Sequence, residues 1–377
     1  MKMRQNLEAL TTLRFFAAAG IVIYHTSSYF EYGTHLQQVF PIGLGVSFFF
    51  VLSGFVLYYA YPELLSGRDR VRFIAARIAK VWPLHAATMF LTIAFLPYPW
   101  GIGPLDSAAP PPLLINLFLL QSWIPLPHYF FSFNGVSWSL SVEMFFYGVF
   151  PFLIWNWERT KCVKLLGTGL LAGCCIAWAT ISHVSFLGDD NVKSIDALVY
   201  IFPAARLFEF TIGILAAWAW GKYRHRLVGF ATLMQSASII LLIFAVPFII
   251  KISNNAASHG YISMATLKWI HGSGSAPIFA IVIYSIALSN GIVARALSLR
   301  PFVLLGEISF SLYLTHQLLM RALDLTDSLS AFGSLRNQLF VYWTMSLTMS
   351  FFLWIFIEKP CRKKILEKFD AMWPEKR

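Results

Sequence analysis

The chain of 377 residues is 58% hydrophobic and only 12% charged, whereas soluble domains carry about 25% charged residues. Its mean hydropathy of +0.64 and its aromatic content of 17% exclude an ordinary soluble protein and are typical of an integral membrane protein with interfacial aromatic belts. The net charge of +11 does not indicate nucleic-acid binding, because the basic residues follow a membrane topology.

Apolar windows of about 20 residues predict an all-α membrane protein of about ten transmembrane helices. The predicted spans cover residues 9–30, 41–61, 82–98, 137–157, 163–182, 198–220, 228–250, 269–290, 302–322 and 337–357. A further apolar stretch, 113–121, is too short to span and is interpreted as re-entrant or interfacial. No separate soluble region is evident, so residues 1–377 are interpreted as a single polytopic membrane domain.

The basic residues predict the topology. Of the 29 Lys and Arg residues, 22 lie in segments on the same side as the N-terminus, five lie on the opposite side and two lie within spans. The positive-inside rule therefore places both termini in the cytoplasm. Because Glu8 and Arg14 interrupt the first apolar run, we interpret it as an uncleaved span. None of the four cysteines falls in a predicted outer loop, so no disulfide framework is expected.

Two ionisable residues, Arg14 and His25, occupy the first span. Eleven residues make about three helical turns, or about 16 Å, so both side chains lie on one face of the helix. Arg in the hydrocarbon region costs about 2.5 kcal/mol or more, which favours a functional interpretation. Histidine changes protonation near neutral pH and is therefore suited to proton transfer.

A basic segment follows the second span, with Arg70, Phe73, Arg77 and Lys80 at helical spacing and Pro83 at the start of the next span. One interpretation is an inner loop that contacts anionic lipid headgroups. The alternative is a cationic site for a phosphorylated cytoplasmic ligand, because Arg and Lys bind phosphate.

Polar residues gather in three later spans. In the fourth, Ser139, Glu143 and Tyr147 share one helix face, and Glu143 is either structural or functional. In the sixth, Arg206 and Glu209 are three residues apart and are interpreted as a structural ion pair. The ninth carries Tyr313 and His316, a pairing that is usually an interfacial anchor. No metal-ligand spacing or phosphate-binding glycine loop is present, so no metal is expected.

Taken in order, these motifs resemble the acyltransferase type 3 family of bacterial polytopic membrane O-acyltransferases. The matching features are Arg14 with His25, Phe49-Phe50-x-x-Ser53-Gly54-Phe55, Arg77-x-x-Lys80-x-x-Pro83, Ser137 to Glu143 with Tyr147, Arg206-x-x-Glu209-Phe210-x-x-Gly213, Ser311-Leu312-Tyr313-Leu314-x-His316 and Glu358-Lys359-Pro360. The family usually has Arg where this chain has Lys80, which keeps the charge but loses bidentate phosphate contact.

The resemblance implies transfer of an acyl group, commonly acetyl, from cytoplasmic acyl-CoA to a hydroxyl of a carbohydrate or related acceptor at the outer face of a bacterial inner membrane. Acyl-CoA is the donor substrate, and no permanently bound cofactor is expected. Some members carry a C-terminal hydrolase-like periplasmic domain, but this chain ends about 20 residues after its last predicted span, so none is expected here.

The predicted roles follow from the residues and the resemblance. His25, Glu143 and Arg14 are predicted to be catalytic. Arg14, Arg72, Arg77 and Lys80 are predicted to bind acyl-CoA. Trp138, Ser139, Tyr147, Tyr313 and His316 are predicted to bind the acceptor. The rival hypothesis is a transporter or flippase, since intramembrane His, Glu and Arg also build proton relays. The absence of a detectable two-half inverted repeat argues against it.

The predicted topology is testable by cysteine labelling in intact cells. Cysteines introduced at Asp106 and Asn191, in predicted outer segments, should react with a membrane-impermeant thiol reagent, whereas one at Arg224 should not. The reverse pattern would overturn both the topology and donor entry from the cytoplasm.

Overall fold

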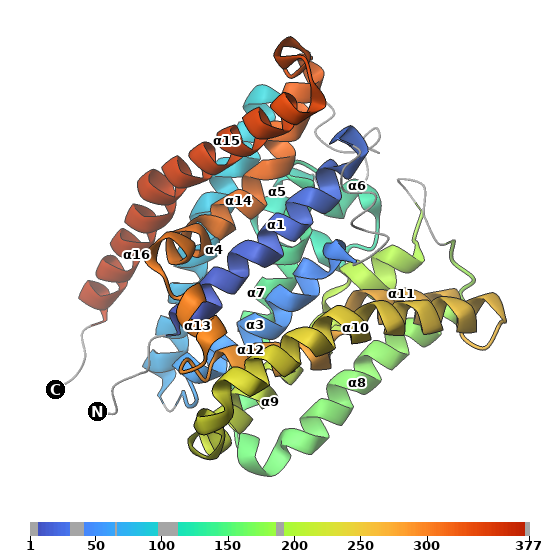
Figure 1. Ribbon diagram of the computed structural model, residues 1–377, viewed down its shortest axis with the longest axis vertical. Helices are drawn as coiled ribbons and strands as arrows, with labels where there is room; N and C mark the ends of the chain where they lie inside the picture. Colours follow the sequence, from blue (N-terminus) through green and yellow to red (C-terminus); the bar gives the residue numbers. More distant parts are fainter. Residues whose placement is uncertain (1–6, 31–40, 65, 97–111, 186–191, 374–377) are drawn as a thin grey trace. The chain divides into compact units, whose positions relative to one another are not determined.

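The computed structural model describes residues 7–30, 41–64, 66–96, 112–185 and 192–373. These residues are almost entirely helical (Figure 1), with one isolated β-bridge between Ser185 and Ser194. The predicted all-α class is therefore confirmed. In the described residues, nine helical stretches are long and apolar enough to cross a membrane. The predicted spans 198–220 and 228–250 both fall in the single stretch Asp196–Ser258, which accounts for the difference from ten.

The chain divides into two compact units, which are described separately. The first comprises Met1–Pro62, Lys161–Leu166 and Phe208–Phe310, and the second comprises Glu63–Thr160, Gly167–Leu207 and Ser311–Arg377. The prediction of one functional domain over residues 1–377 stays a prediction.

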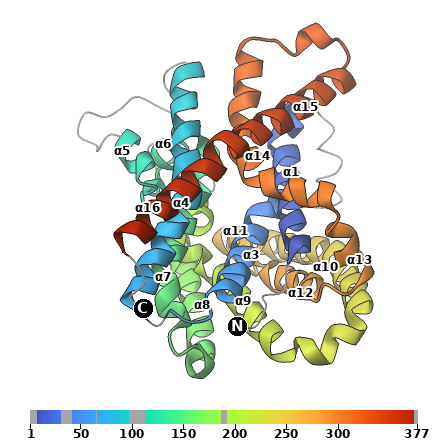
Figure 2. The same ribbon diagram turned by 90° about the vertical axis from the view of Figure 1, so that its left-hand side faces the viewer.

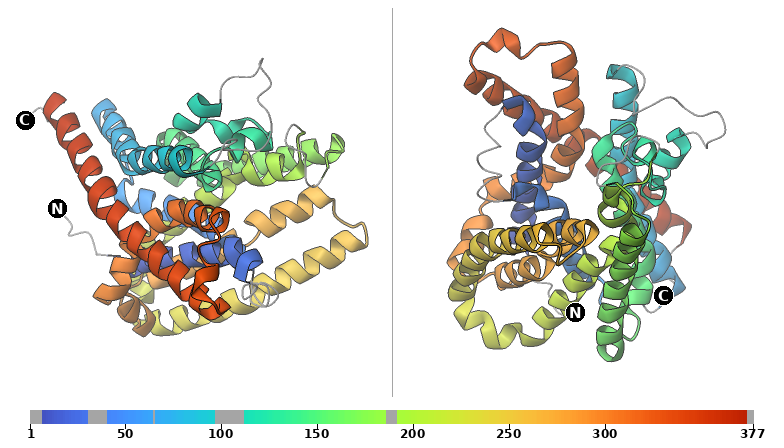
Figure 3. Two further views of the ribbon diagram at one scale, coloured as in Figure 1. Left: turned by 90° about the horizontal axis from the view of Figure 1, so that it is seen from above. Right: turned by 90° about the vertical axis from the view of Figure 1, so that its right-hand side faces the viewer.

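The first unit is built mainly from the helices of two stretches, Met1–Pro62 and Phe208–Phe310. Its elements are α1 (Glu8–Phe30), η1 (Ile42–Leu44), α3 (Gly45–Ala60), most of α9 (Pro203–Leu227), η5 (Val228–Phe230), α10 (Ala231–Ser258), α11 (Met264–Ser273), α12 (Ala276–Ile286), α13 (Ile292–Leu297) and the first turns of α14 (Arg300–Leu325). The predicted span 269–290 is thus divided into α11 and α12. Helix α10 runs beside α11, as Figure 3 shows, and also packs along α12.

Glycines bring α3 and α9 into backbone contact. A Cβ added at Gly54 would lie 2.0 Å from the carbonyl oxygen of Phe210, and one added at Gly213 would lie 2.0 Å from that of Val51. Lipid chains are as apolar as the helix surfaces, so membrane helices associate largely through such close packing of small residues. The motif glycines of the second and sixth predicted spans therefore meet each other.

Helix α1 is held by backbone contacts at two levels. A Cβ at Gly306 of α14 would lie 2.1 Å from the carbonyl oxygen of Thr11, and one at Gly45 of α3 would lie 2.6 Å from that of Ala17. The Thr12 hydroxyl donates a 2.6 Å hydrogen bond to the carbonyl of Leu297. These contacts fix the N-terminal half of α1, which carries Arg14.

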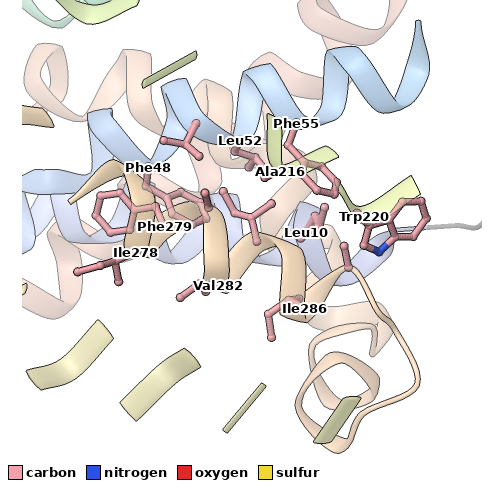
Figure 4. Packing of buried hydrophobic residues seen from close by; sticks show 14 of the residues in the cluster. Leu10, Phe48, Leu52, Phe55, Ala216, Trp220, Ile278, Phe279, Val282 and Ile286 are labelled. Carbon is pink, nitrogen blue, oxygen red and sulfur yellow. The ribbon is translucent and has the colours of Figure 1, made fainter. Parts of the chain in front are cut away.

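An apolar core fills the space between α3, α9 and α12, as Figure 4 shows. Phe48 meets Phe279 edge to face with ring centroids 5.7 Å apart, and Phe55 meets Trp220 at 6.3 Å. Leu10 brings α1 into the same cluster. The arrangement of aromatic edges and faces favours one packing of these helices over others.

In the second unit, α4 (Gly67–Phe95) is one continuous helix of 29 residues. It starts at a capping box, in which the Ser66 hydroxyl accepts from the Asp69 amide and the Asp69 carboxylate accepts from the Ser66 amide. The predicted span 82–98 was therefore wrong in its start, because the helix already begins at Gly67, while the helical spacing of the basic residues is confirmed. The basic residues lie on the first turns of a helix, because the cap favours helix from Gly67 onward.

The second unit also holds α7 (Trp138–Ile154), most of α8 (Trp157–Ile181) and the π-helix η4 (Asp196–Ile201). Helix α14 continues into α15 (Leu335–Leu353) through η6 (Ser330–Phe332), and the π-helix η7 (Trp354–Glu358) leads into α16 (Lys359–Met372). Helix α16 packs along α4, as Figure 2 shows. Helix α16 thereby contacts the basic first turns of α4.

Short helices connect α4 to α7. They are α5 (Pro112–Leu117), η2 (Gln121–Trp123), α6 (Pro127–Phe130) and η3 (Gly135–Ser137). The prediction that residues 113–121 are too short to span is confirmed, because α5 has six residues. The labelling positions Asp106 and Asn191 lie outside the described residues.

The α3–α9 contact predicts an unequal response to added methyl groups. Gly54→Ala should lower stability by about 1–3 kcal/mol, because the new Cβ forces two backbones apart. Gly173→Ala on α8 is the matched control, since nothing lies within 4 Å of its Cβ position, and it should be neutral or stabilising by up to about 1 kcal/mol. Thermal unfolding of both variants in detergent checks this, and equal melting temperatures would contradict the contact.

Candidate active site

Helix α1 carries Arg14 and His25 on one uninterrupted helix. Arg14 is half-buried and makes no hydrogen bond or ion pair with any residue that the structure describes. His25 is also half-buried, and its ring lies 5.5 Å from that of Tyr24. Because the helix has no break between Arg14 and His25, the two residues lie on one face of α1, as their spacing predicts.

The Tyr313 hydroxyl is the centre of a buried cluster in the second unit. It pairs with the Ser139 hydroxyl at 2.7 Å and donates to the carbonyl of Val136 at 2.9 Å. The ring of His316 lies 6.0 Å from that of Tyr313, and the imidazole Nδ1 is 2.7 Å from the Tyr313 carbonyl oxygen. Two predicted acceptor residues from α14 and one from α7 are thus brought together.

Tyr200 joins this cluster to Arg206, although no sequence pattern singles it out. The Trp138 and Tyr200 rings are 5.2 Å apart, and the Arg206 guanidinium lies 4.6 Å from the Tyr200 ring centroid. Arg206 also donates to the Tyr200 carbonyl at 3.1 Å. Tyr200 lies on η4, and π-helices are frequent at functional sites. Only its position before Phe202-Pro203, where a helix must break, was visible in the sequence.

Arg77 is buried and contacts the Tyr147 ring instead of lying on a solvated surface. Its guanidinium lies 5.9 Å from the Tyr147 ring centroid and 5.8 Å from that of Phe73. Tyr147 is eight residues, or about 12 Å, along α7 from Ser139. One predicted acceptor residue therefore contacts a predicted donor-binding residue, apart from the Tyr313 cluster.

Arg72 forms a bidentate ion pair with Asp370 of α16. Its Nε donates to Oδ1 at 2.8 Å and its Nη2 to Oδ2 at 3.0 Å. Beside it, Arg68 donates to the carbonyl of Trp373 through Nε at 3.0 Å and Nη2 at 2.8 Å. Both basic residues hold the C-terminal helix, a role that sequence spacing alone does not reveal, because the partners are about 300 positions apart.

The remaining predicted residues are placed but not tested. Lys80 and Glu143 are half-buried on α4 and α7. Arg206 and Glu209 are fully buried on α9, and their ion pair stays a prediction. Glu143 belongs to the second unit and His25 to the first, so an action of Glu143 on His25 also stays a prediction.

The apolar helices define an integral, multi-pass membrane protein. Its sequence matches the acyltransferase domain family (Acyl_transf_3) over residues 7–359. The chain therefore belongs to this family and is an acyltransferase, as its motifs predict.

Several known proteins are similar to this chain. Acyltransferase MdmB of Streptomyces mycarofaciens is 30% identical over 84% of this chain and 79% of its own length. O-acetyltransferase OatA of Staphylococcus aureus is 24% identical over 98% of this chain, which spans 59% of that relative. Nodulation protein 10 of Rhizobium leguminosarum bv. viciae is 23% identical over 82% of each chain. No solved structure matches significantly.

The Arg72–Asp370 pair separates two roles for Arg72. If Arg72 acts by holding α16, Asp370→Ala should weaken acyl-CoA binding as much as Arg72→Ala does. If Arg72 binds the donor directly, only Arg72→Ala should do so. We expect the first result, with little loss of stability in either variant, because the pair is partly exposed. Isothermal titration with acetyl-CoA and limited proteolysis of the C-terminus measure both effects.

Proposed function

We propose that this acyltransferase moves an acetyl group from cytoplasmic acyl-CoA to a hydroxyl of a carbohydrate or related acceptor. The observation that carries the proposal is the pair on α1: an uninterrupted helix presents His25 and, on the same face, a half-buried guanidinium without a partner in the described chain. A half-buried cation in a membrane span requires an anionic or strongly polar partner, and an acyl-CoA donor supplies phosphates and amide carbonyls.

His25 is proposed as the general base. Neutral imidazole takes the proton of the acceptor hydroxyl while the hydroxyl oxygen attacks the thioester carbonyl. The carbon–sulfur bond then breaks, the imidazolium returns the proton to the departing thiolate, and the products are an ester and free CoA. Such proton transfer typically contributes about 10²–10⁴-fold to the rate. In the alternative, the imidazole attacks the thioester carbonyl, the thiolate leaves, and a covalent acyl-His forms. The acceptor hydroxyl then attacks the acyl-His and its proton ends on the thiolate, so the products are the same ester and free CoA.

Arg14 is proposed to contact the donor on the cytoplasmic side of His25. The helix rise separates the two residues by about 16 Å, a span that suits the narrow pantetheine arm. This direction depends on the proposed topology, in which both termini are cytoplasmic and the membrane is the bacterial inner membrane. The basic turns of α4, with Arg77 and Lys80, remain proposed donor contacts.

The acceptor is proposed to be a hydroxyl compound, and two observations support this class. The Tyr313 cluster provides hydroxyl groups and aromatic faces, from Ser139, Tyr313, Trp138 and Tyr200, which suit sugar hydroxyls and sugar rings. A relative is named an O-acetyltransferase. The transporter alternative gains no support, because the family is one of acyltransferases.

His25→Ala tests the proposal directly. Purified wild-type protein should release free CoA from acetyl-CoA when given a hydroxylated acceptor, and His25→Ala should reduce that rate at least 100-fold while still inserting and purifying. His225→Ala removes an exposed imidazole from the end of α9 and is the matched control. Transfer near the wild-type rate by His25→Ala would remove both the base and the nucleophile roles.

A further inference from the structure

The segment that joins α4 to α7 carries backbone strain. Leu119 and Phe133 both have a φ of 57°, in the left-handed region that bulky residues avoid. Both side chains are buried, so neither strained residue lies at a free loop tip. Strain of this kind persists where surrounding structure enforces it, often at ligand-binding sites.

The same segment packs around polar side chains with unused hydrogen-bonding capacity. The imidazole Nε2 of His85 lies 2.8 Å from the backbone carbonyl of Asn116. A carbonyl only accepts, so Nε2 carries the proton and Nδ1 of the neutral ring is an acceptor. The Asn116 Nδ2 donates to the carbonyls of Pro112 and Tyr129, which fixes its Oδ1 as the opposite, accepting atom.

Two more amides are oriented in the same way. The Asn134 Nδ2 donates to the carbonyl of Leu314 at 2.8 Å, and the Gln121 Nε2 donates to that of Ser137 at 3.1 Å. Their oxygens, like the His85 Nδ1 and the Asn116 Oδ1, are buried and have no hydrogen-bond partner in the described chain. All four side chains are at most 3% exposed.

These acceptors belong to one connected network. Thr88 donates to the carbonyl of His85 at 3.0 Å and accepts from the Asn134 Nδ2 at 3.2 Å. Asn116 donates to the Ser132 hydroxyl, and Gln121 reaches the η3 turn that follows Asn134. These four unused atoms are all acceptors, on α4 and on the connecting segment, which is tied to α14 through Asn134.

The missing partner must donate hydrogen bonds. Leaving a buried acceptor unpaired is unfavourable, and four together disfavour the closed arrangement. Within the described residues, the hydrogen-bonded partners of these side chains are neutral amides, hydroxyls and carbonyls, so these contacts offer an organic cation no counter-charge and an anion no donor. Neutral hydroxyl groups fit, because each offers one donor.

We propose that residues 112–137 open from α4 to admit hydroxyl groups of a saccharide, which bind the His85 Nδ1 and the Asn116, Gln121 and Asn134 side-chain oxygens. Opening relieves the strain at Leu119 and Phe133, and the saccharide satisfies the acceptors. The assignment of this saccharide as the acyl acceptor rests on the proposed function, whereas the binding site itself does not.

Cysteine accessibility tests the opening. With the four native cysteines replaced by alanine, Ser132→Cys is compared with Ser238→Cys under a small water-soluble thiol reagent. The two serines are similarly buried, at 3% and 1% exposed, and each donates to the carbonyl three residues earlier, while Ser132 also accepts from Asn116. Ser132→Cys should react at least tenfold faster, because only its segment opens. Equal rates would show that residues 112–137 are locked and would overturn the proposal.

Protection from labelling tests the ligand class. Glucose, galactose and N-acetylglucosamine are each added to Ser132→Cys, with betaine as a control solute that lacks hydroxyls. At least one saccharide should slow labelling threefold or more, and Asn134→Leu in the same background should abolish the protection. Gln121→Met serves in place of Asn134→Leu if that variant does not fold.

The outcomes are distinguishable from failure of the proposed function. Fast labelling that none of the saccharides slows, or that betaine slows equally, would overturn the hydroxyl site. Protection in a protein that releases no CoA from acetyl-CoA would leave the saccharide site standing and remove the acyl-transfer proposal, because labelling needs no donor.

Discussion

The backbone contact between α3 and α9 at Gly54 and Gly213 is the constraint on which the first unit depends. Within lipid, burial of apolar side chains does not by itself drive helices together, so close approach and dispersion must do so. Once these two helices are in contact, Phe55 and Trp220 pack beside each other, and α12 completes the cluster through Phe279. The contacts of α1 then orient the helix that carries the proposed catalytic pair.

The second unit is held together differently, by polar groups that bridge distant parts of the chain. Tyr313 ties α14 to α7, Asn134 ties the connecting segment to α14, and Asp370 ties the last helix to the first turns of α4. The Tyr313 and Asn134 bridges satisfy buried groups that would be costly to leave unpaired, whereas the Asp370 bridge is partly exposed. The buried acceptors of His85, Asn116, Gln121 and Asn134 have no such partner in the described chain, and three of the four lie in the segment that contains the strained residues.

Much of the fold could be predicted from the sequence because span length and residue spacing are local properties. The positions of the spans and the single helix bearing Arg14 and His25 follow from patterns within about 20 residues. The continuity of α4 was missed because its basic first turns are not apolar, although the Ser66–Asp69 cap was readable. The Arg72–Asp370 pair, the contact between Arg77 and Tyr147, and the role of Tyr200 depend on tertiary packing, which no local pattern contains.

The contacts of α1 also bear on how the protein is made. Thr12 hydrogen-bonds to Leu297, 285 residues later, and Thr11 packs against Gly306. At synthesis rates of about 5–20 residues per second, these partners leave the ribosome about 15–60 s after α1. During that interval α1, with its half-buried Arg14, lacks the neighbours that later enclose it. The nascent first helix is therefore the part of this protein most dependent on the insertion machinery, or on a chaperone within the membrane, to shield it until α13 and α14 arrive.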